Sequence, residues 1–289
     1  MSALAAASVA VAMGAAIVTP TLAGASKPAP AAKLQKMSAA ELRVVRQFLS
    51  HLKIGFRPGM LVRGSVVNGV TQLTSTTLSG YADEGVAEGF TSVSASWVQP
   101  TAKCGQTQSL AVFWVGLDGM STSDPTVEED GTFIQCPGGN AHPMYFDWWE
   151  MYPTNNVELV ASVSPGDHIA AKVVFSGGTY TLSVRDATDT AGSFSTSQTC
   201  GTTACEDMSA EWIAEDPCCT DTSVYNLANF HSWKATGAYE TYSGKHGGIS
   251  GPPTTDEITL VDTMNLVKAK PGAVNSTNHA FTVTWKKAS

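Results

Sequence analysis

The eight residues Ser209-Ala210-Glu211-Trp212-Ile213-Ala214-Glu215-Asp216 predict a β-strand. Side chains alternate between the two faces of a strand, so Glu211, Ile213 and Glu215 share one face while Trp212 points to the other. A carboxyl group among large apolar side chains is poorly solvated, which raises its pKa toward the range useful for acid–base catalysis. Taken alone, the segment also fits an edge strand with two exposed acids, so the rest of the sequence has to decide between the two interpretations.

The sequence around this strand, from residue 71 to residue 289, consists of further short strands. Runs of β-branched and aromatic residues alternate with Gly, Ser, Thr, Asn and Asp, a pattern typical of an antiparallel sandwich or barrel. No internal repeat and no glycine-rich phosphate loop occurs. The other clearest strands are expected at Phe90–Val98, Leu110–Leu117, Met144–Tyr152, Val157–Val163, His168–Phe175, Thr179–Val184 and Phe281–Trp285.

The first 25 residues resemble an export signal. The apolar run Ala3–Val18 is followed by Pro20 and by Ala23-Gly24-Ala25, small residues that suit signal cleavage, although no Lys or Arg precedes the run. The run is shorter than the roughly 18 residues of a membrane span. We therefore expect a signal peptide at 1–25, a secreted protein and no membrane partner.

Residues 26–70 are expected to form a basic propeptide. Residues 1–70 hold eight Lys or Arg and one acid, a balance of +7, whereas residues 71–289 have a balance of −15. Leu42, Val45, Leu49 and Leu52 recur at helical spacing and predict a short helix that ends before Gly55. A basic segment and an acidic body can neutralise each other, and the acidic body argues against nucleic acid as a partner. A disordered basic linker before a binding module is the alternative.

Six cysteines in an exported chain indicate disulfides. Cys200 and Cys205 bracket a short turn and are the first pair expected, with Cys104–Cys136 as the second. The state of the adjacent Cys218–Cys219 is left open. No Cys-x-x-Cys occurs and the six histidines are scattered, so no metal site is expected.

Three further segments place acids and aromatic residues on strands. They are Trp114-Val115-Gly116-Leu117-Asp118-Gly119, Val127-Glu128-Glu129-Asp130-Gly131 and Tyr145-Phe146-Asp147-Trp148-Trp149-Glu150-Met151-Tyr152-Pro153. In the last one, alternation puts Trp148, Glu150 and Tyr152 on one face. Together with the Glu211 segment, these blocks resemble the glutamic peptidases (eqolisins), from roughly Ser79 to the C-terminus.

This resemblance implies an all-β fold, an antiparallel β-sandwich of lectin-like (jelly-roll or concanavalin-like) architecture. It also implies a secreted, monomeric acid endopeptidase that acts on protein or peptide substrates, needs no cofactor and is made with its own N-terminal propeptide. Glu211 matches the family's catalytic glutamate. The residues that match the lining of the cleft or its hydrogen-bonding support are Trp114, Asp118, Trp148, Glu150 and Tyr152.

The sequence departs from the family at the partner of this glutamate. The family uses a glutamine there, and the matching residue is Glu129; the nearby Gln135 lies outside the motif. Two further departures are Phe146, where some members have an acid, and Leu78, where an aromatic residue is usual. An ionised Glu129 has no proton to donate to an oxyanion, whereas a protonated one does, and two close carboxyl groups share a proton.

The sequence therefore predicts an acid endopeptidase that uses a Glu129/Glu211 pair and is inactive near neutral pH. Falling pH would also loosen the propeptide as carboxylates approach their reference pKa values. The alternative is a catalytically inactive relative that binds carbohydrate or peptide. A retaining glycosidase using Glu211 and Glu215 fits the carboxylates but not the motif blocks, and no Gly-x-Ser-x-Gly elbow supports a serine hydrolase.

Overall fold

A computed structural model describes residues 52–53, 61–120, 126–219 and 225–289. Almost all regular structure in this part of the chain is β-strand, with one three-residue 3-10 helix, η1 (Thr190–Gly192). The strands are β1 (Leu52–Lys53), β2 (Leu61–Val67), β3 (Val70–Ser75), β4 (Leu78–Glu84), β5 (Phe90–Val98), β6 (Ser109–Leu117), β7 (Val127–Cys136), β8 (Met144–Tyr152), β9 (Asn155–Ser162), β10 (His168–Ser176), β11 (Thr179–Asp186), β12 (Phe194–Gln198), β13 (Ser209–Glu215), β14 (Cys218–Cys219), β15 (Asn226–Leu227), β16 (Ser232–Tyr242), β17 (Lys245–Gly247), β18 (Thr254–Val261), β19 (Val267–Pro271) and β20 (Ala280–Trp285).

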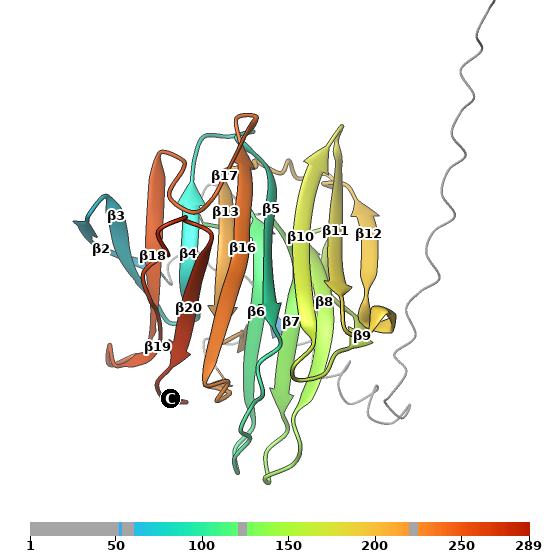
Figure 1. The fold of residues 1–289 in the computed structure, drawn as a ribbon, viewed down its shortest axis with the longest axis vertical. Helices are drawn as coiled ribbons and strands as arrows, with labels where there is room; N and C mark the ends of the chain where they lie inside the picture. Colours follow the sequence, from blue (N-terminus) through green and yellow to red (C-terminus); the bar gives the residue numbers. More distant parts are fainter. Residues whose placement is uncertain (1–51, 54–60, 121–125, 220–224) are drawn as a thin grey trace, which may run out of the picture.

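The strands form two packed layers (Figure 1). In the first layer, neighbouring strands pair in the order β2-β3-β18-β4-β13-β6-β7-β8-β9. In the second, the order is β12-β11-β10-β5-β16-β20-β19, and β19 also pairs with β18, which joins the layers at one edge. Most pairs are antiparallel, while β3 with β18 and β6 with β15 are parallel. The expected antiparallel β-sandwich is confirmed.

Apolar side chains fill the space between the layers. Alternate residues of β13 and β6 point inward, and Trp212, Phe113 and Trp233 are almost fully buried there. The Trp212 indole donates a hydrogen bond of 2.9 Å to the carbonyl oxygen of Ser94 in the opposite layer. The outer face of the first layer carries a second buried cluster that includes Trp114, Trp148 and Ile213. The first layer is therefore apolar on both faces, and its outer face holds Glu211.

The expected strands agree with the structure. Phe90–Val98 and Met144–Tyr152 have the predicted bounds, and the others differ by at most two residues at either end. Both expected disulfides are present, with S–S distances of 2.04 Å for Cys104–Cys136 and 1.99 Å for Cys200–Cys205. None of the residues described forms a helix long and apolar enough to cross a membrane.

The N-terminal predictions lie mostly outside the described residues. The signal peptide and the helix up to residue 51 fall there. The predicted helix is wrong near its C-terminal end, because Leu52 and Lys53 form β1, whose backbone pairs with Cys219 and Cys218 of β14. Residues 61–67, which fall within the predicted propeptide, form the edge strand β2 against β3.

Candidate active site

Six residues from neighbouring strands stand at the same level across the outer face of the first layer. Cross-strand pairing links Glu150 to Glu129, Glu129 to Gly116, Gly116 to Glu211, Glu211 to Ala82, and Ala82 to Asp256. We call this set the carboxylate row: Glu150, Glu129, Gly116, Glu211, Ala82 and Asp256. Because paired strands lie about 4.8 Å apart, the row brings together carboxyl groups from segments that are far apart in sequence.

Gly116 makes room between the two central glutamates. A Cβ atom at this position would lie 2.8 Å from Cγ of Glu129 and 3.0 Å from Cζ3 of Trp114. The Glu129 side chain therefore lies over the backbone of β6 at Gly116, whose other neighbour in the row is Glu211. A side chain at position 116 would collide with the Glu129 side chain and the Trp114 ring.

Burial decides the protonation state of Glu129. Glu129 is 0% exposed, and Glu211 is 1% exposed. Burial raises the pKa of Glu129 well above its ordinary value, and the charges of Glu150, Glu215 and Glu211 raise it further. A carboxyl group in this setting keeps its proton and can donate a hydrogen bond.

Aromatic side chains extend the site on both sides of the row. The Trp114 indole donates a hydrogen bond of 2.8 Å to Oε2 of Glu215, which fixes the ring beside the row. Trp148 is fully buried opposite Gly131, two residues before Glu150 on the same face of β8. Tyr152, at the end of β8, is 41% exposed and lies beyond Glu150, opposite Val127.

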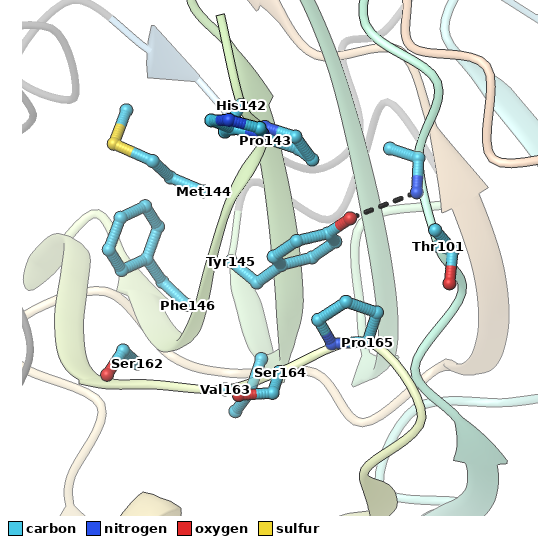
Figure 2. Close-up of a pocket in the computed structure, with 11 residues that line it drawn as sticks. Thr101, His142, Pro143, Met144, Tyr145, Phe146, Ser162, Val163, Ser164 and Pro165 are labelled. Carbon is cyan, nitrogen blue, oxygen red and sulfur yellow. Dashed lines mark hydrogen bonds between the residues drawn. The ribbon is translucent and has the colours of Figure 1, made fainter.

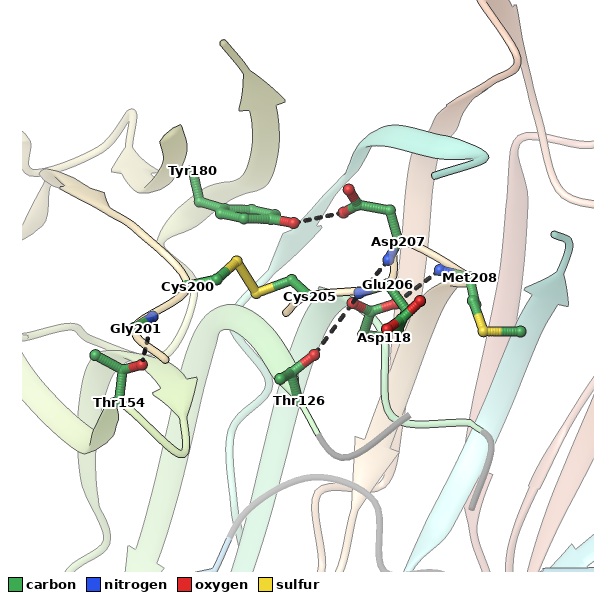
Figure 3. Close-up of a disulfide and its surroundings, with 10 residues drawn as sticks. All are labelled: Asp118, Thr126, Thr154, Tyr180, Cys200, Gly201, Cys205, Glu206, Asp207 and Met208. Atoms are coloured by element: carbon green, nitrogen blue, oxygen red, sulfur yellow. Dashed lines mark hydrogen bonds between the residues drawn. A yellow bond between two sulfur atoms is a disulfide. The ribbon is translucent and has the colours of Figure 1, made fainter. Parts of the chain in front are cut away.

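Asp118 lies beside the row rather than in it. It follows β6 with a left-handed φ of 67°, and Figure 3 shows its carboxylate within the turn that leads into β13. Its oxygens accept hydrogen bonds from the backbone N–H groups of Glu206 (2.9 Å), Asp207 (2.9 Å) and Met208 (2.7 Å). Asp118 therefore fixes the start of the strand that carries Glu211.

Three buried carboxylates meet beside this turn. Oxygens of Asp118, Glu128 and Asp207 lie within 4.8 Å of one another. Oxygen ligands suit a hard cation such as Ca²⁺. Hydrogen bonds within the protein, however, already explain why two of these carboxylates are here. Asp118 accepts the three N–H groups, and Asp207 accepts a hydrogen bond of 2.7 Å from the Tyr180 hydroxyl. Cys200 and Cys205, which lie close to Glu128, are joined in a disulfide.

Comparison with known proteins identifies the family. The sequence model of the peptidase A4 family matches residues 76–284, most of the chain and all strands of the carboxylate row. The protein belongs to the peptidase A4 family. It is a glutamic peptidase, a hydrolase that acts as an endopeptidase on peptide or protein substrates. No curated protein matches the chain.

Solved structures of glutamic peptidases share the sandwich of this A4 peptidase. Scytalido-glutamic peptidase, solved with a peptide-based transition state analog, is 20% identical, with a TM-score of 0.60 over 73% of this chain and 98% of that one. The eqolisin SCP-B, solved in complex with the tripeptide Ala-Ile-His, is 19% identical, with a TM-score of 0.59 over the same shares. Aspergilloglutamic peptidase from Aspergillus niger is 24% identical, with a TM-score of 0.50 over 62% and 99%. These likenesses establish the fold.

A short segment of this A4 peptidase, β1, lies near the end of the strand that carries Glu211. β1 pairs with β14, which follows β13, and also approaches β9. In the first layer, β6, β7 and β8 separate β13 from β9, and their other face packs on β5, β10 and β11 of the second layer. The backbone of Leu52 and Lys53 therefore lies close both to β14, which follows β13, and to β9.

A pocket of about 460 Å³ lies at the other end of β8. Figure 2 shows the Tyr145 hydroxyl on one side of it, accepting a hydrogen bond of 3.0 Å from the backbone N–H of Ala102. Phe146, one of the departures from the family pattern, also lines this pocket. Phe146 pairs with Phe133, so it lies on β8 four residues before Glu150 and away from the row.

Sequence reasoning missed three features of the site in this A4 peptidase. Gly116 was part of a quoted motif but was not recognised as the residue between the two glutamates. The hydrogen bond from Trp114 to Glu215 and the place of Asp256 in the row were also missed. All three depend on which strands become neighbours, for which a single sequence carries no local signal.

Proposed function

We propose that the protein is an acid endopeptidase in which Glu211 is the general base and a protonated Glu129 is the hydrogen-bond donor. The observation that carries this proposal is the position of the two glutamates on either side of Gly116 in the carboxylate row. Burial and the neighbouring carboxylates favour the protonated form of Glu129. This form supplies the donor that the family's glutamine amide would supply.

The proposed reaction needs one proton donor and one proton acceptor. Ionised Glu211 takes a proton from a water molecule as the water oxygen attacks the scissile carbonyl carbon. The Glu129 hydroxyl donates a hydrogen bond to the developing oxyanion, an interaction whose removal costs about 3–4 kcal/mol in comparable sites. Protonated Glu211 then returns its proton to the leaving nitrogen, and the C–N bond breaks.

Neighbouring residues have supporting roles in this proposal. Trp114, held by Glu215, and Trp148 form apolar walls beside the reacting groups. Glu150 lies directly opposite Glu129 on the neighbouring strand, so the Glu150 carboxyl group, whether ionised or protonated, is next to Glu129. Asp118 positions β13 through the turn at 206–208. Tyr152 is exposed and would contact substrate only at the rim of the cleft.

We also propose that the protein is secreted as a zymogen, with a signal peptide at 1–25 and a propeptide at 26–70. The two disulfides support secretion, because such bonds persist in oxidising compartments. The position of β1 near β14 and β9 supports a propeptide that covers the site. Its removal would open the face that holds Glu211 and Glu129.

Purified full-length protein tests both proposals together. The protein is shifted from pH 7 to pH 4, and mass spectrometry then follows its N-terminus. We expect the wild type to lose its N-terminal segment within hours and the Glu211→Gln variant to stay intact. Glu158→Gln, which changes an exposed glutamate of β9, is the matched control and should process normally. Processing of pure Glu211→Gln protein would contradict the assignment of Glu211.

A further inference from the structure

At the end of the carboxylate row, two acidic side chains bind an arginine of the same chain. Nη2 of Arg63, in β2, lies 3.2 Å from Oε1 and 3.4 Å from Oε2 of Glu84. Its Nη1 lies 3.7 Å from Oδ1 of Asp256. To make these contacts, Arg63 extends across β3, since β18 with Asp256 and β4 with Glu84 are the next strands in the layer.

Asp256 is a buried carboxylate that needs a cation. Its side chain is 0% exposed, and within the described part of the chain the only groups close to its oxygens are the Arg63 guanidinium and the Glu84 carboxyl group. A buried charge is costly unless a counter-ion faces it. In the structure described, the counter-ion is Arg63, whose own side chain is 55% exposed. The site is thus built around a cation that arrives from the solvent side.

Glu84 completes the site, because its carboxyl group lies beside that of Asp256. The pKa of Glu84 is raised to about 7, and burial is the largest cause. The hydrogen bond with Asp256 and the charge of Asp256 also raise it. Glu84 is therefore protonated at acidic pH, and the two side chains together offer several acceptor oxygens. A guanidinium group, with five N–H donors in one plane, matches such a set of acceptors.

We infer that Glu84 and Asp256 form a substrate-binding subsite for an arginine or lysine side chain, which Arg63 occupies before the propeptide is removed. This inference rests on the proposed function, in which residues 26–70 are cleaved from the enzyme. Asp256 stands two strands from Glu211 in the row, a backbone separation of about 10 Å. An extended peptide covers this distance in about three residues. The subsite would therefore select a basic residue about three positions from the scissile bond.

Paired substrates test this subsite in the processed enzyme. Peptides carry either arginine or citrulline, its uncharged near-isostere, at one of four positions on each side of the scissile bond. We expect kcat/KM to favour arginine about tenfold at one position, which corresponds to about 1.4 kcal/mol. The Asp256→Asn variant should bring this ratio close to one. Equal rates for arginine and citrulline at every position in the wild type would overturn the inference.

A binding measurement decides the inference even if neither peptide is cleaved, an outcome that would contradict the proposed function instead. Full-length Arg63→Gln protein, whose subsite is vacated, is titrated with N-acetyl-arginine amide and followed by NMR. We expect saturable binding that Arg63→Gln/Asp256→Asn protein and wild type lack. Arg185→Gln, which removes an exposed arginine of β11, should behave like the wild type. Absence of binding to Arg63→Gln would overturn the subsite.

Discussion

Glu211 and Glu129 stand on opposite sides of Gly116 at one level of the first layer, both almost fully buried. This relationship explains how a glutamate can take the place of the family's glutamine. Burial and like charges raise the pKa of Glu129, and in the proposed reaction the protonated Glu129 is therefore the donor and Glu211 the base.

Substitution of Gly116 by alanine should impair catalysis with only a modest loss of stability. The new Cβ would lie 2.8 Å from Cγ of Glu129 and 3.0 Å from the Trp114 ring, so the Glu129 side chain has to move. A shift of about 1 Å in a catalytic group can cost about 100-fold in rate, and overpacking costs about 1–3 kcal/mol. We expect kcat/KM to fall 10- to 100-fold, measured on a casein-derived peptide.

Gly105→Ala is the matched control for this substitution, because no atom lies within 4 Å of its added Cβ. It should keep full activity and stability. Gly116→Ala protein with activity within twofold of wild type would show that the space above Gly116 is not needed.

Asp118→Asn should destabilise the protein and reduce activity further than the loss of folded protein explains. Asp118 accepts three backbone hydrogen bonds with both oxygens, and an amide NH₂ would face at least one of the N–H donors. A lost hydrogen bond to a charged group costs about 1.5–3 kcal/mol. Urea unfolding should show a loss of this size, and kcat should fall because the turn leads into β13.

The control for this substitution is Asp189→Asn, since Asp189 caps η1 at the surface and asparagine caps a helix as well as aspartate. If Asp118→Asn protein has the same midpoint urea concentration of unfolding as the wild type, the turn at 206–208 does not depend on the charge of Asp118.

Stability should be greatest at acidic pH and fall as pH rises, because many buried carboxyl groups have raised pKa values. Burial raises the pKa of Asp147, which faces the interior between the layers, to about 8. Its ordinary value in an unfolded chain is about 3.9. A raised pKa means that the folded state binds more protons than the unfolded state between pH 4 and pH 8, so the free energy of unfolding falls across that window.

Asp147→Asn should remove part of this fall. Asparagine stays neutral, and its oxygen can still accept the hydrogen bond from the backbone N–H of Ala161. We expect the variant to match the wild type near pH 4 and to exceed it by on the order of 2–4 kcal/mol at pH 7.5, measured by urea unfolding. Parallel pH curves for the two proteins would contradict the prediction.

Asp262→Asn provides a control of opposite sign. A hydrogen bond from Lys287 lowers the pKa of Asp262, which is a surface residue. Its contribution is therefore present above the unfolded pKa of about 3.9 and lost below it. This variant should be less stable than the wild type at pH 7 and similar to it near pH 2.

Local patterns in the sequence predicted the strands and their faces. Alternation placed Trp212 and Glu211 on opposite faces of one strand, and in the structure Trp212 lies between the layers while Glu211 lies on the outer face of the first layer. The turn between Cys200 and Cys205 predicted their disulfide. These features depend on neighbours in the chain, so a single sequence contains them.

Features that depend on strand order could not be predicted in the same way. Asp256 reaches the row only because β18 inserts between β3 and β4, and Arg63 reaches it from the edge strand β2. The importance of Gly116 also follows from register, because shifting β7 by one residue would turn Glu129 to the other face. The family resemblance supplied Glu211 and Glu129, and the structure supplied their geometry.

The most direct test of the account is the digestion of an unfolded protein from pH 2 to pH 7 by processed wild type, Glu211→Gln and Glu129→Gln, with pepstatin present. We predict that the wild type cuts only at acidic pH, that Glu211→Gln is inactive, and that Glu129→Gln remains active toward higher pH because an amide donates at any pH. Activity in Glu211→Gln, or a Glu129→Gln profile that does not extend beyond that of the wild type, would contradict the glutamate pair.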